Sequence, residues 1–297
     1  MNDDSPPLVR LSHLDHLWFQ VAGTRCNLTC HHCFISCSPK NDRFGYLSFD
    51  LVQRYLEESV GLGVKEYYFT GGEPFLHPEM VPILIETLRF GPATVLTNAT
   101  VFKDAWLKAL AAAEEASLYS LEFRVSIDGF SPETNDPIRG DGTFERAMRG
   151  VEQLVEQGFL PIITGARTWR PDQEAEVVGR FVEVLKARGY ARPRLKLLPM
   201  LQIGAEAERT RAYNDVERID QGMMNGFDAA QLLCEHSRMV TDRGVYVCPI
   251  LIETPEARLG DTLAESFRPF ALAHGACFTC YQHGAICANA ASSSDFS

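Results

Sequence analysis

Strand-like and helix-like segments alternate along most of this chain, and the alternation limits its fold more than any other feature of the sequence. Short runs rich in β-branched and aromatic residues are each followed by a longer segment with helical spacing of apolar residues. The predicted strands are 17–22, 66–70, 94–97, 121–127, 160–164 and 195–198. The predicted helices are 47–61, 78–90, 103–112, 144–158 and 173–189. Repeated βα units of this kind favour a parallel sheet covered by helices.

About six βα units are too few to close the standard eight-stranded barrel. We therefore predict an α/β fold, an open partial (β/α)6 TIM-like barrel with its site at the carboxyl ends of the strands. The pattern stops near Gly204, and the region after it is small and rich in cysteine. The predicted organisation is an N-terminal lead-in (1–16), the barrel core (17–204), a linker helix (205–225) with a Cys-rich extension up to residue 289, and a disordered tail (290–297).

Composition excludes several classes of protein. The formal net charge of -11 argues against a nucleic-acid surface, which normally shows as a basic stripe. No apolar run approaches the ~20 residues that span a bilayer, so no membrane association is expected. The first ten residues are acidic and polar, unlike a signal peptide. We therefore expect a cytoplasmic protein.

Nine cysteines fall into two groups separated by a long cysteine-free stretch. Reducing compartments do not sustain structural disulfides, and buried thiols acting as small apolar groups would scatter through strands and helices. These cysteines instead lie in polar and glycine-rich loops, which favours metal ligation. The first group is Cys26, Cys30, Cys33 and Cys37, and the second is Cys234, Cys248, Cys277, Cys280 and Cys287.

The first group contains the run Cys26-x3-Cys30-x2-Cys33, directly after the first predicted strand. Three thiolates can ligate three irons of a cubane and leave the fourth open, whereas electron-transfer clusters usually have four Cys ligands. A structural zinc loop that adds a histidine is the alternative. The run resembles the signature of the radical S-adenosylmethionine (SAM) superfamily. The resemblance implies a 4Fe-4S cluster on Cys26, Cys30 and Cys33 whose open iron binds the amino and carboxylate groups of SAM, with His32 packed near this cofactor.

Motifs at the ends of later strands resemble the same family. Gly71-Gly72-Glu73-Pro74 resembles its GGE motif, in which glycines permit close backbone approach and Glu73 would accept a hydrogen bond from the SAM ammonium. Three further matches imply residues around the SAM pocket, although each is also compatible with an ordinary strand end or a surface arginine. They are Thr97-Asn98, Ser126-Ile127-Asp128-Gly129 and Arg139-Gly140, with Asn98, Ser126, Asp128 and Arg139 as the candidate residues.

Cys37 adds a thiol to the minimal motif. A fourth ligand on the same cluster would block SAM, so we predict that Cys37 is unligated, as a structural thiol or as a hydrogen-atom donor near the site. The second group of cysteines resembles the twitch and SPASM extensions of radical SAM enzymes. That resemblance implies one auxiliary 4Fe-4S cluster on Cys234, Cys248, Cys277 and Cys280, with Cys287 as an alternative ligand or a free thiol. A structural zinc ribbon is the alternative.

The resemblance implies an enzyme to which reduced flavodoxin or ferredoxin delivers one electron. SAM is then cleaved to a 5'-deoxyadenosyl radical, which takes a hydrogen atom from the substrate. We expect oxidation or epimerisation of a small molecule, because the segment before Cys26 is too short for the leader-peptide-binding domain fused to many peptide modifiers. Radical modification of a peptide or protein is the alternative. Outside this class stand a non-enzymatic iron-sulfur protein, which would not need the Glu73 turn, and a structural zinc protein.

Overall fold

The computed structural model describes residues 5–284, 286 and 287. Its strands are β1 (Leu8–Val9), β2 (His16–Gln20), β3 (Glu66–Thr70), β4 (Ala93–Thr97), β5 (Leu121–Ser126), β6 (Ile162–Ala166), β7 (Arg194–Leu198), β8 (Ser237–Thr241), β9 (Gly244–Tyr246), β10 (Arg258–Gly260) and β11 (Phe270–Ala271). Its α-helices are α1 (Phe49–Val60), α2 (Met80–Thr87), α3 (Asp104–Glu115), α4 (Pro132–Arg139), α5 (Thr143–Glu156), α6 (Glu174–Ala187), α7 (Ala205–Arg209) and α8 (Gly275–His283). Its short 3-10 helices are Pro74–Leu76, Pro171–Gln173, Ala229–Gln231, Leu233–Glu235, Pro255–Ala257 and Ala264–Ser266.

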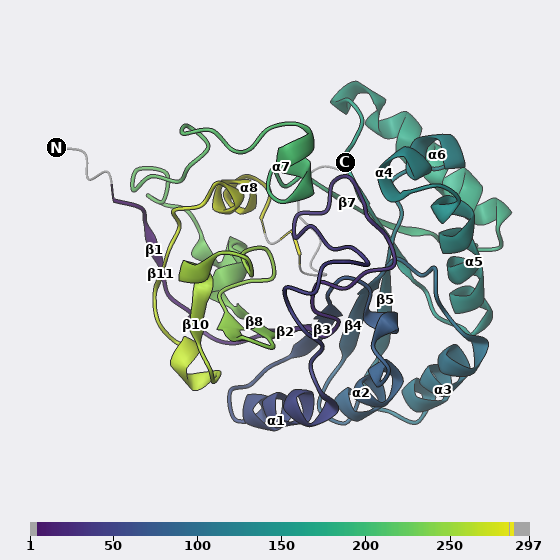
Figure 1. Cartoon of the computed structure of the whole chain (residues 1–297), viewed down its shortest axis with the longest axis horizontal. Helices are drawn as coiled ribbons and strands as arrows, with labels where there is room; N and C mark the ends of the chain where they lie inside the picture. Colours follow the sequence, from purple (N-terminus) through teal and green to yellow (C-terminus); the bar gives the residue numbers. More distant parts are fainter. Residues whose placement is uncertain (1–4, 285, 288–297) are drawn as a thin grey trace.

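One large sheet organises the molecule. Its strand order is β10-β9-β8-β2-β3-β4-β5-β6-β7, with β8 and β2 to β7 parallel and the β8-β9-β10 pairings antiparallel. The six predicted strands are all present in this sheet, and the predicted βα alternation is confirmed. Strands β7 and β10 are its two edges, so the sheet is open. Figure 1 shows the helices arranged in an arc around it.

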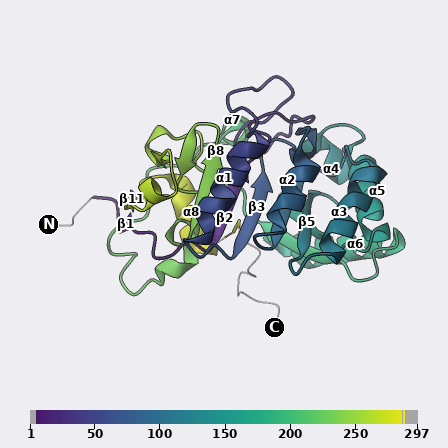
Figure 2. The same cartoon turned by 90° about the horizontal axis from the view of Figure 1, so that it is seen from below.

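The two faces of the sheet differ in character because side chains alternate along each strand. On β5, Phe123 and Val125 belong to the apolar core beneath the helices, which Figure 2 shows side by side along one side of the sheet. Arg124 and Ser126 point the other way, into a cavity. We call the surface opposite the helices the inner face. It is the face that positions the candidate site.

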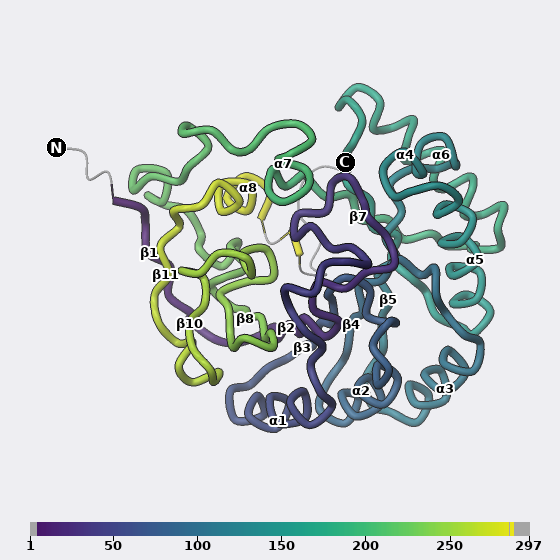
Figure 3. Tube along the Cα trace, in the orientation of Figure 1, coloured from purple at the N-terminus to yellow at the C-terminus, as the bar shows by residue number. Residues whose placement is uncertain are grey.

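The C-terminal region continues the same sheet. Strand β8 pairs in parallel with β2, in the register His16 to Ser237. Strand β1 pairs with β11, so the start of the described chain lies beside a strand from its last thirty residues, as Figure 3 shows. The predicted boundary at residue 204 therefore marks a change in sequence pattern and not a break in the sheet.

The predicted linker helix over 205–225 is wrong. Helix α7 ends at Arg209, and the chain then runs through turns. The physical reason is composition, because this stretch lacks an apolar face and contains turn-forming residues such as Asn214 and Gly222. Helix α4, capped by Ser131 and Thr134, was not predicted. The tail predicted to be disordered lies outside the described residues.

Strand β6 begins two residues later than predicted, since Pro161 has no N–H to donate to a neighbouring strand. Throughout the described part of the chain, no helix combines the length and the apolar character that crossing a membrane requires.

Candidate active site

The first three cysteines lie on a loop that follows β2 and is closed at its base. Arg25 and Ser38 form a bridge, and the Cys26 N–H donates to the Ser38 carbonyl at 3.2 Å. Gly204 lies against the far side of this loop, where an added Cβ would meet the Cys33 carbonyl at 2.7 Å. The chain thus holds the loop both at its base and beside Cys33.

A cavity of about 230 Å³ opens between this loop, the carboxyl ends of the strands and the inner face. Cys26, Cys30 and Cys33 all line it, and so does Cys37. Most of the predicted cofactor-binding residues line it as well, namely His32, Gly71, Gly72, Asn98, Ser126, Asp128 and Arg139. The tertiary structure therefore brings motifs from four strand ends to one cavity.

Glycines let the turn after β3 lie directly against the cysteine loop. An added Cβ on Gly72 would stand 1.9 Å from the Arg25 carbonyl oxygen, a distance that no side chain can accept. The Gly72 N–H donates to the Gly23 carbonyl at 2.9 Å, and the Glu73 N–H donates to the Arg25 carbonyl at 3.0 Å. The two motifs are consequently locked together by main-chain contacts.

The Glu73 side chain is turned away from the cavity. It is fully buried, and neither Glu73 nor Pro74 lines the cavity. Its carboxylate accepts hydrogen bonds from the Phe75 N–H at 3.0 Å, the Thr97 hydroxyl at 2.7 Å and the Asn98 N–H at 2.7 Å. Burial raises the pKa of Glu73 to about 7, although these donors oppose the shift. This geometry favours a positioning role for Glu73, in place of the direct contact with SAM that the sequence predicts.

Each of the three motif thiols has an N–H donor beside its sulfur. At Cys26, the Leu28 N–H lies 3.4 Å and the Asn98 side-chain amide 3.8 Å from Sγ. Arg139 Nη1 lies 4.0 Å from Cys30 Sγ, and the Cys37 N–H lies 3.2 Å from Cys33 Sγ. N–H donors in these positions stabilise thiolates, and they tune the reduction potential of an iron-sulfur cluster that the thiolates bind.

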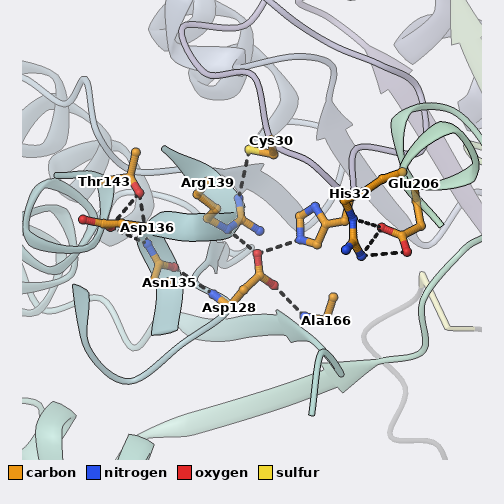
Figure 4. A network of polar contacts seen from close by, with 10 residues as sticks. Cys30, His32, Asp128, Asn135, Asp136, Arg139, Thr143, Ala166 and Glu206 are labelled. Carbon is orange, nitrogen blue, oxygen red and sulfur yellow. Dashed lines mark hydrogen bonds and ion pairs between the residues drawn. The ribbon is translucent and has the colours of Figure 1, made fainter. Parts of the chain in front are cut away.

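Asp128 is the centre of a buried polar network, which Figure 4 shows. Its Oδ2 lies 2.6 Å from His32 Nε2 and 2.5 Å from Arg139 Nε, and its Oδ1 accepts from the Ala166 N–H at 2.7 Å. Burial alone would raise the pKa of Asp128, but the Arg139 guanidinium and His32 hold it well below its usual range. Because Arg139 also approaches Cys30, this carboxylate links the end of β5 to the cysteine loop.

Backbone conformation is unusual at the same place. In the described residues, Ser36 and Ala99 are the non-glycine residues with positive φ, at 48° and 56°. Ser36 lies in the cysteine loop, and Ala99 follows the Thr97-Asn98 pair at the end of β4. Such conformations persist where the surrounding contacts over-determine them, and they are concentrated at functional sites.

The C-terminal cysteines converge although they are distant in sequence. Cys234, Cys248, Cys277 and Cys280 line a second, apolar cavity beside α8. Burial and then the neighbouring Cys248 raise the pKa of Cys234 to about 12. Burial raises the pKa of Cys280 well above its usual value, and charge on any of the other four cysteines of this group would raise it further. These thiols are therefore close enough to influence one another.

A family comparison decides the class of protein. Residues 21–177, just over half of the chain, match the family model described as "Radical SAM superfamily". The matched segment contains the cysteine loop, the glycine turn and the Asp128 network. The chain belongs to the radical SAM superfamily.

Curated relatives of this radical SAM chain match it over part of their length. The AdoMet-dependent heme synthase of Methanosarcina barkeri is 34% identical over 48% of this chain and 39% of that protein. The GTP 3',8-cyclase of Pasteurella multocida is 26% identical over 67% of this chain and 57% of that protein. The mycofactocin maturase MftC of Mycobacterium tuberculosis is 29% identical over 54% of this chain and 41% of that protein. The chain thus spans about half the length of these relatives or less.

Solved structures show the same fold at low sequence identity. Native anSMEcpe with bound AdoMet superposes with a TM-score of 0.63 at 19% identity, covering 85% of this chain and 80% of that chain. Streptococcus suis SuiB bound to the precursor peptide SuiA gives a TM-score of 0.63 at 15% identity, covering 87% of this chain and 66% of that chain. At these identities the likeness shows a shared α/β fold alone.

The residues present fit the cofactors that the radical SAM family implies. Three thiols with their own N–H donors open onto a cavity that still contains buried hydrogen-bonding atoms without a partner, such as His32 Nδ1. In residues 5–284, 286 and 287, no three His, Cys, Asp or Glu side chains are grouped as ligands of one metal ion. That finding concerns a single ion, whereas each ligand of a cubane binds a different iron.

Some residues that line this cavity were missed by sequence reasoning. Trp18, Gln20, Arg124 and Thr164 line the cavity from the inner face, and none was predicted as a site residue. The available signal was strand alternation. On β5 apolar Phe123 and Val125 alternate with Arg124 and Ser126, and in a helix-covered sheet the polar set must face away from the helices.

Proposed function

We propose that this chain catalyses reductive cleavage of SAM at a 4Fe-4S cluster held by Cys26, Cys30 and Cys33, followed by hydrogen-atom abstraction from a substrate. The observation that carries the proposal is that three thiols, each with an N–H donor beside its sulfur, line one cavity together with the other family motifs. The cluster and SAM, when bound, supply one-electron reduction and a 5'-deoxyadenosyl radical. Flavodoxin or ferredoxin is the proposed electron donor.

The chain's own residues would bind and orient SAM. Gly71 and Gly72 line the cavity with main-chain groups that can approach the SAM ammonium closely, and Glu73 holds that turn from behind. The guanidinium of Arg139, oriented by Asp128, is a fixed cation for the SAM carboxylate. Asn98 and Ser126 line the same cavity and offer polar groups to the nucleoside. These roles are part of the proposal.

The C-terminal cysteines are proposed to hold an auxiliary 4Fe-4S cluster. Their support is the placement of Cys234, Cys248, Cys277 and Cys280 around one small cavity, with Cys287 close to Cys280. Four thiols from three separate segments match the four-Cys ligand set of a closed cluster. Such a cluster would bind the substrate or accept the electron that remains after abstraction. The zinc ribbon that the sequence leaves as an alternative has less support, because no three of the described His, Cys, Asp or Glu side chains are grouped around one metal ion.

The substrate class is proposed as a small molecule that undergoes oxidation or epimerisation. Modification of a peptide is the second candidate, and a specific observation favours it. The similar structures include SuiB bound to a precursor peptide and anSMEcpe with a bound peptide. The relatives also include a GTP 3',8-cyclase, so the family context contains both classes.

The test is iron content together with SAM cleavage after anaerobic reconstitution. The unaltered chain should carry about eight irons, from two four-iron clusters with full ligand sets. Replacing Cys26, Cys30 and Cys33 together by Ala should remove about four irons and abolish formation of 5'-deoxyadenosine. Cys37→Ala is the matched control, and it should keep all the iron because Cys37 is assigned as unligated. Persistence of SAM cleavage in the triple variant would end the proposal.

A further inference from the structure

A buried arginine faces the cavity from the middle of the inner face. Arg124, on β5, is 1% exposed and lines the cavity that the three motif cysteines also line. Its guanidinium donates to the Cys287 carbonyl and, at 3.4 Å, to the Thr164 hydroxyl. Both acceptors are neutral. A buried guanidinium with only neutral partners retains most of its desolvation cost.

No carboxylate among the described residues lies within ion-pair distance of this guanidinium. Ion pairs are found throughout residues 5–284, but none of them includes Arg124. Glu122 and Glu66 are the carboxylates whose charge raises the pKa of Arg124. Glu122 pairs with Arg194 at 2.6 Å, and Glu66 accepts from the Tyr68 hydroxyl at 2.6 Å. These carboxylates have their own partners.

A second cation adds to the positive charge. Lys196 lies on β7, and burial together with the neighbouring Arg124 lowers the pKa of its ammonium to about 8. The charge of each cation therefore reaches the other, and a negative group beside Arg124 is attracted by both.

The wall formed by β2 carries two unsatisfied polar atoms of opposite kind. Trp18 and Gln20 are each 1% exposed and line the same cavity. Neither the Trp18 indole N–H nor the Gln20 Oε1 has a hydrogen-bond partner. The Gln20 amide nitrogen donates to the Gly23 carbonyl at 2.8 Å, which leaves Oε1 as an acceptor. Buried polar atoms without partners are costly, and in a cavity the partner can come from a ligand or from water.

We propose that this part of the cavity binds a substrate with a carboxylate paired to Arg124 and an amide or ammonium N–H directed at Gln20. Such a molecule is amino-acid-like, either a free amino acid or the C-terminal residue of a peptide. Its oxygen atoms can also accept from Trp18. This inference rests on the proposed function, since it places the substrate in the cavity where SAM would be cleaved.

The experiment measures which small molecules the reconstituted holoenzyme retains in the presence of SAM. Three probe mixtures are used, namely the N-acetyl amino acids, their primary amides and the free amino acids, with ultrafiltration and mass spectrometry as the readout. The acids should be retained at least about tenfold better than the amides, as a charge-assisted hydrogen bond predicts. Retention of the N-acetyl acids above the free amino acids would identify a peptide C-terminus, and the reverse would identify a free amino acid.

Variants connect the preference to Arg124. Arg124→Gln should reduce the ratio of retained acid to retained amide to about one. Arg124→Lys should give a ratio between one and that of the unaltered chain. Gln20→Leu should weaken acids and amides alike. Arg170→Gln is the matched control, because it removes a guanidinium whose side chain is 75% exposed and should keep the full ratio. Circular dichroism and SAM affinity are measured on each variant, and Arg124→Lys carries the test if Arg124→Gln does not fold.

Three results would overturn the inference. They are equal retention of acids and amides by the unaltered chain, retention of neither, and an unchanged ratio in Arg124→Gln. If the unaltered chain retains the acids preferentially but forms no 5'-deoxyadenosine, the proposed function is refuted and this inference is not. The two failures are thus distinguishable.

Discussion

Replacing Asp128 by Asn should destabilise this fold far more than an ordinary polar substitution. The carboxylate has no exposed side-chain surface, and it contacts Arg139 at 2.5 Å and His32 at 2.6 Å. Asparagine keeps the size of the side chain but leaves the Arg139 guanidinium buried without its counter-charge. Breaking one side of a buried ion pair costs about 3 to 5 kcal/mol. For a domain of this size that corresponds to a fall of about 6 to 10 °C or more in melting temperature.

Asp136→Asn provides the matched control. Asp136 belongs to the adjacent part of the same network, but it caps the start of α5 by accepting from the Gly142 and Phe144 N–H groups, both at 2.8 Å. Loss of such a cap costs about 0.5 to 2 kcal/mol. Thermal and denaturant unfolding of both variants, measured anaerobically, gives the comparison. A cost for Asp128→Asn below about 1 kcal/mol, or no larger than that for Asp136→Asn, would refute the ion-pair argument.

The same substitution has a defined pH dependence. The folded-state pKa of Asp128 is held below its usual value, so its contribution to stability is present above the unfolded pKa of about 4 and is lost only as pH falls below that value. The penalty for Asp128→Asn should therefore not shrink between pH 8 and pH 5. A penalty that shrinks within this window would show that the carboxylate is not held as an anion.

Three further substitutions test other parts of the site. For Glu73, burial raises the folded pKa to about 7, above its unfolded value, so the parent protein loses stability as pH rises towards 7. The loss of unfolding free energy caused by Glu73→Gln should therefore shrink between pH 5 and pH 8 by up to about 3 kcal/mol. A loss that does not depend on pH would contradict this argument. Gly72→Ala should prevent cluster assembly, because the new Cβ would lie 1.9 Å from a carbonyl oxygen. In the control, Gly179→Ala, the new Cβ meets no atom within 4 Å, and the change should stabilise α6 by about 0.5 to 1 kcal/mol. Normal iron content in Gly72→Ala would refute the argument. Changing Cys277 and Cys280 together to Ala should leave about four irons and intact SAM cleavage but remove substrate turnover; turnover at the parent rate in the folded variant would make these thiols structural at most.

The βα alternation and the first cysteine motif were readable from the sequence because both are local. A strand with apolar residues facing its helices shows its period within five or six residues, and β2 to β7 all lie within about two residues of their predicted positions. The spacing of Cys26, Cys30 and Cys33 is likewise contained in one loop. The wrong prediction of a linker helix also concerned a local pattern. The stretch after Arg209 has many polar residues that are individually compatible with a helix, but it has no apolar face that would pack a helix against the fold.

The role of Glu73 could not be read from its motif. The sequence places a carboxylate next to two glycines, and a solvated carboxylate there would meet the SAM ammonium. Only the tertiary structure shows that β4 comes alongside and that Thr97 and Asn98 occupy both carboxylate oxygens. The difference is one of direction, since a side chain at a turn can face either side of it.

The sequence by itself determined the family, the order of the strands along the chain and the three thiols of the first cluster motif, because each depends on residues that are neighbours in sequence. The tertiary structure decided which distant groups share a cavity. It placed Cys234 and Cys248 beside the α8 cysteines, turned Arg139 to Asp128 and set Arg124 across the inner face from Gln20. The physical reason is that a parallel sheet brings together residues from strands far apart in sequence. The Arg124 guanidinium is buried without an ion-pair partner only once that sheet has formed.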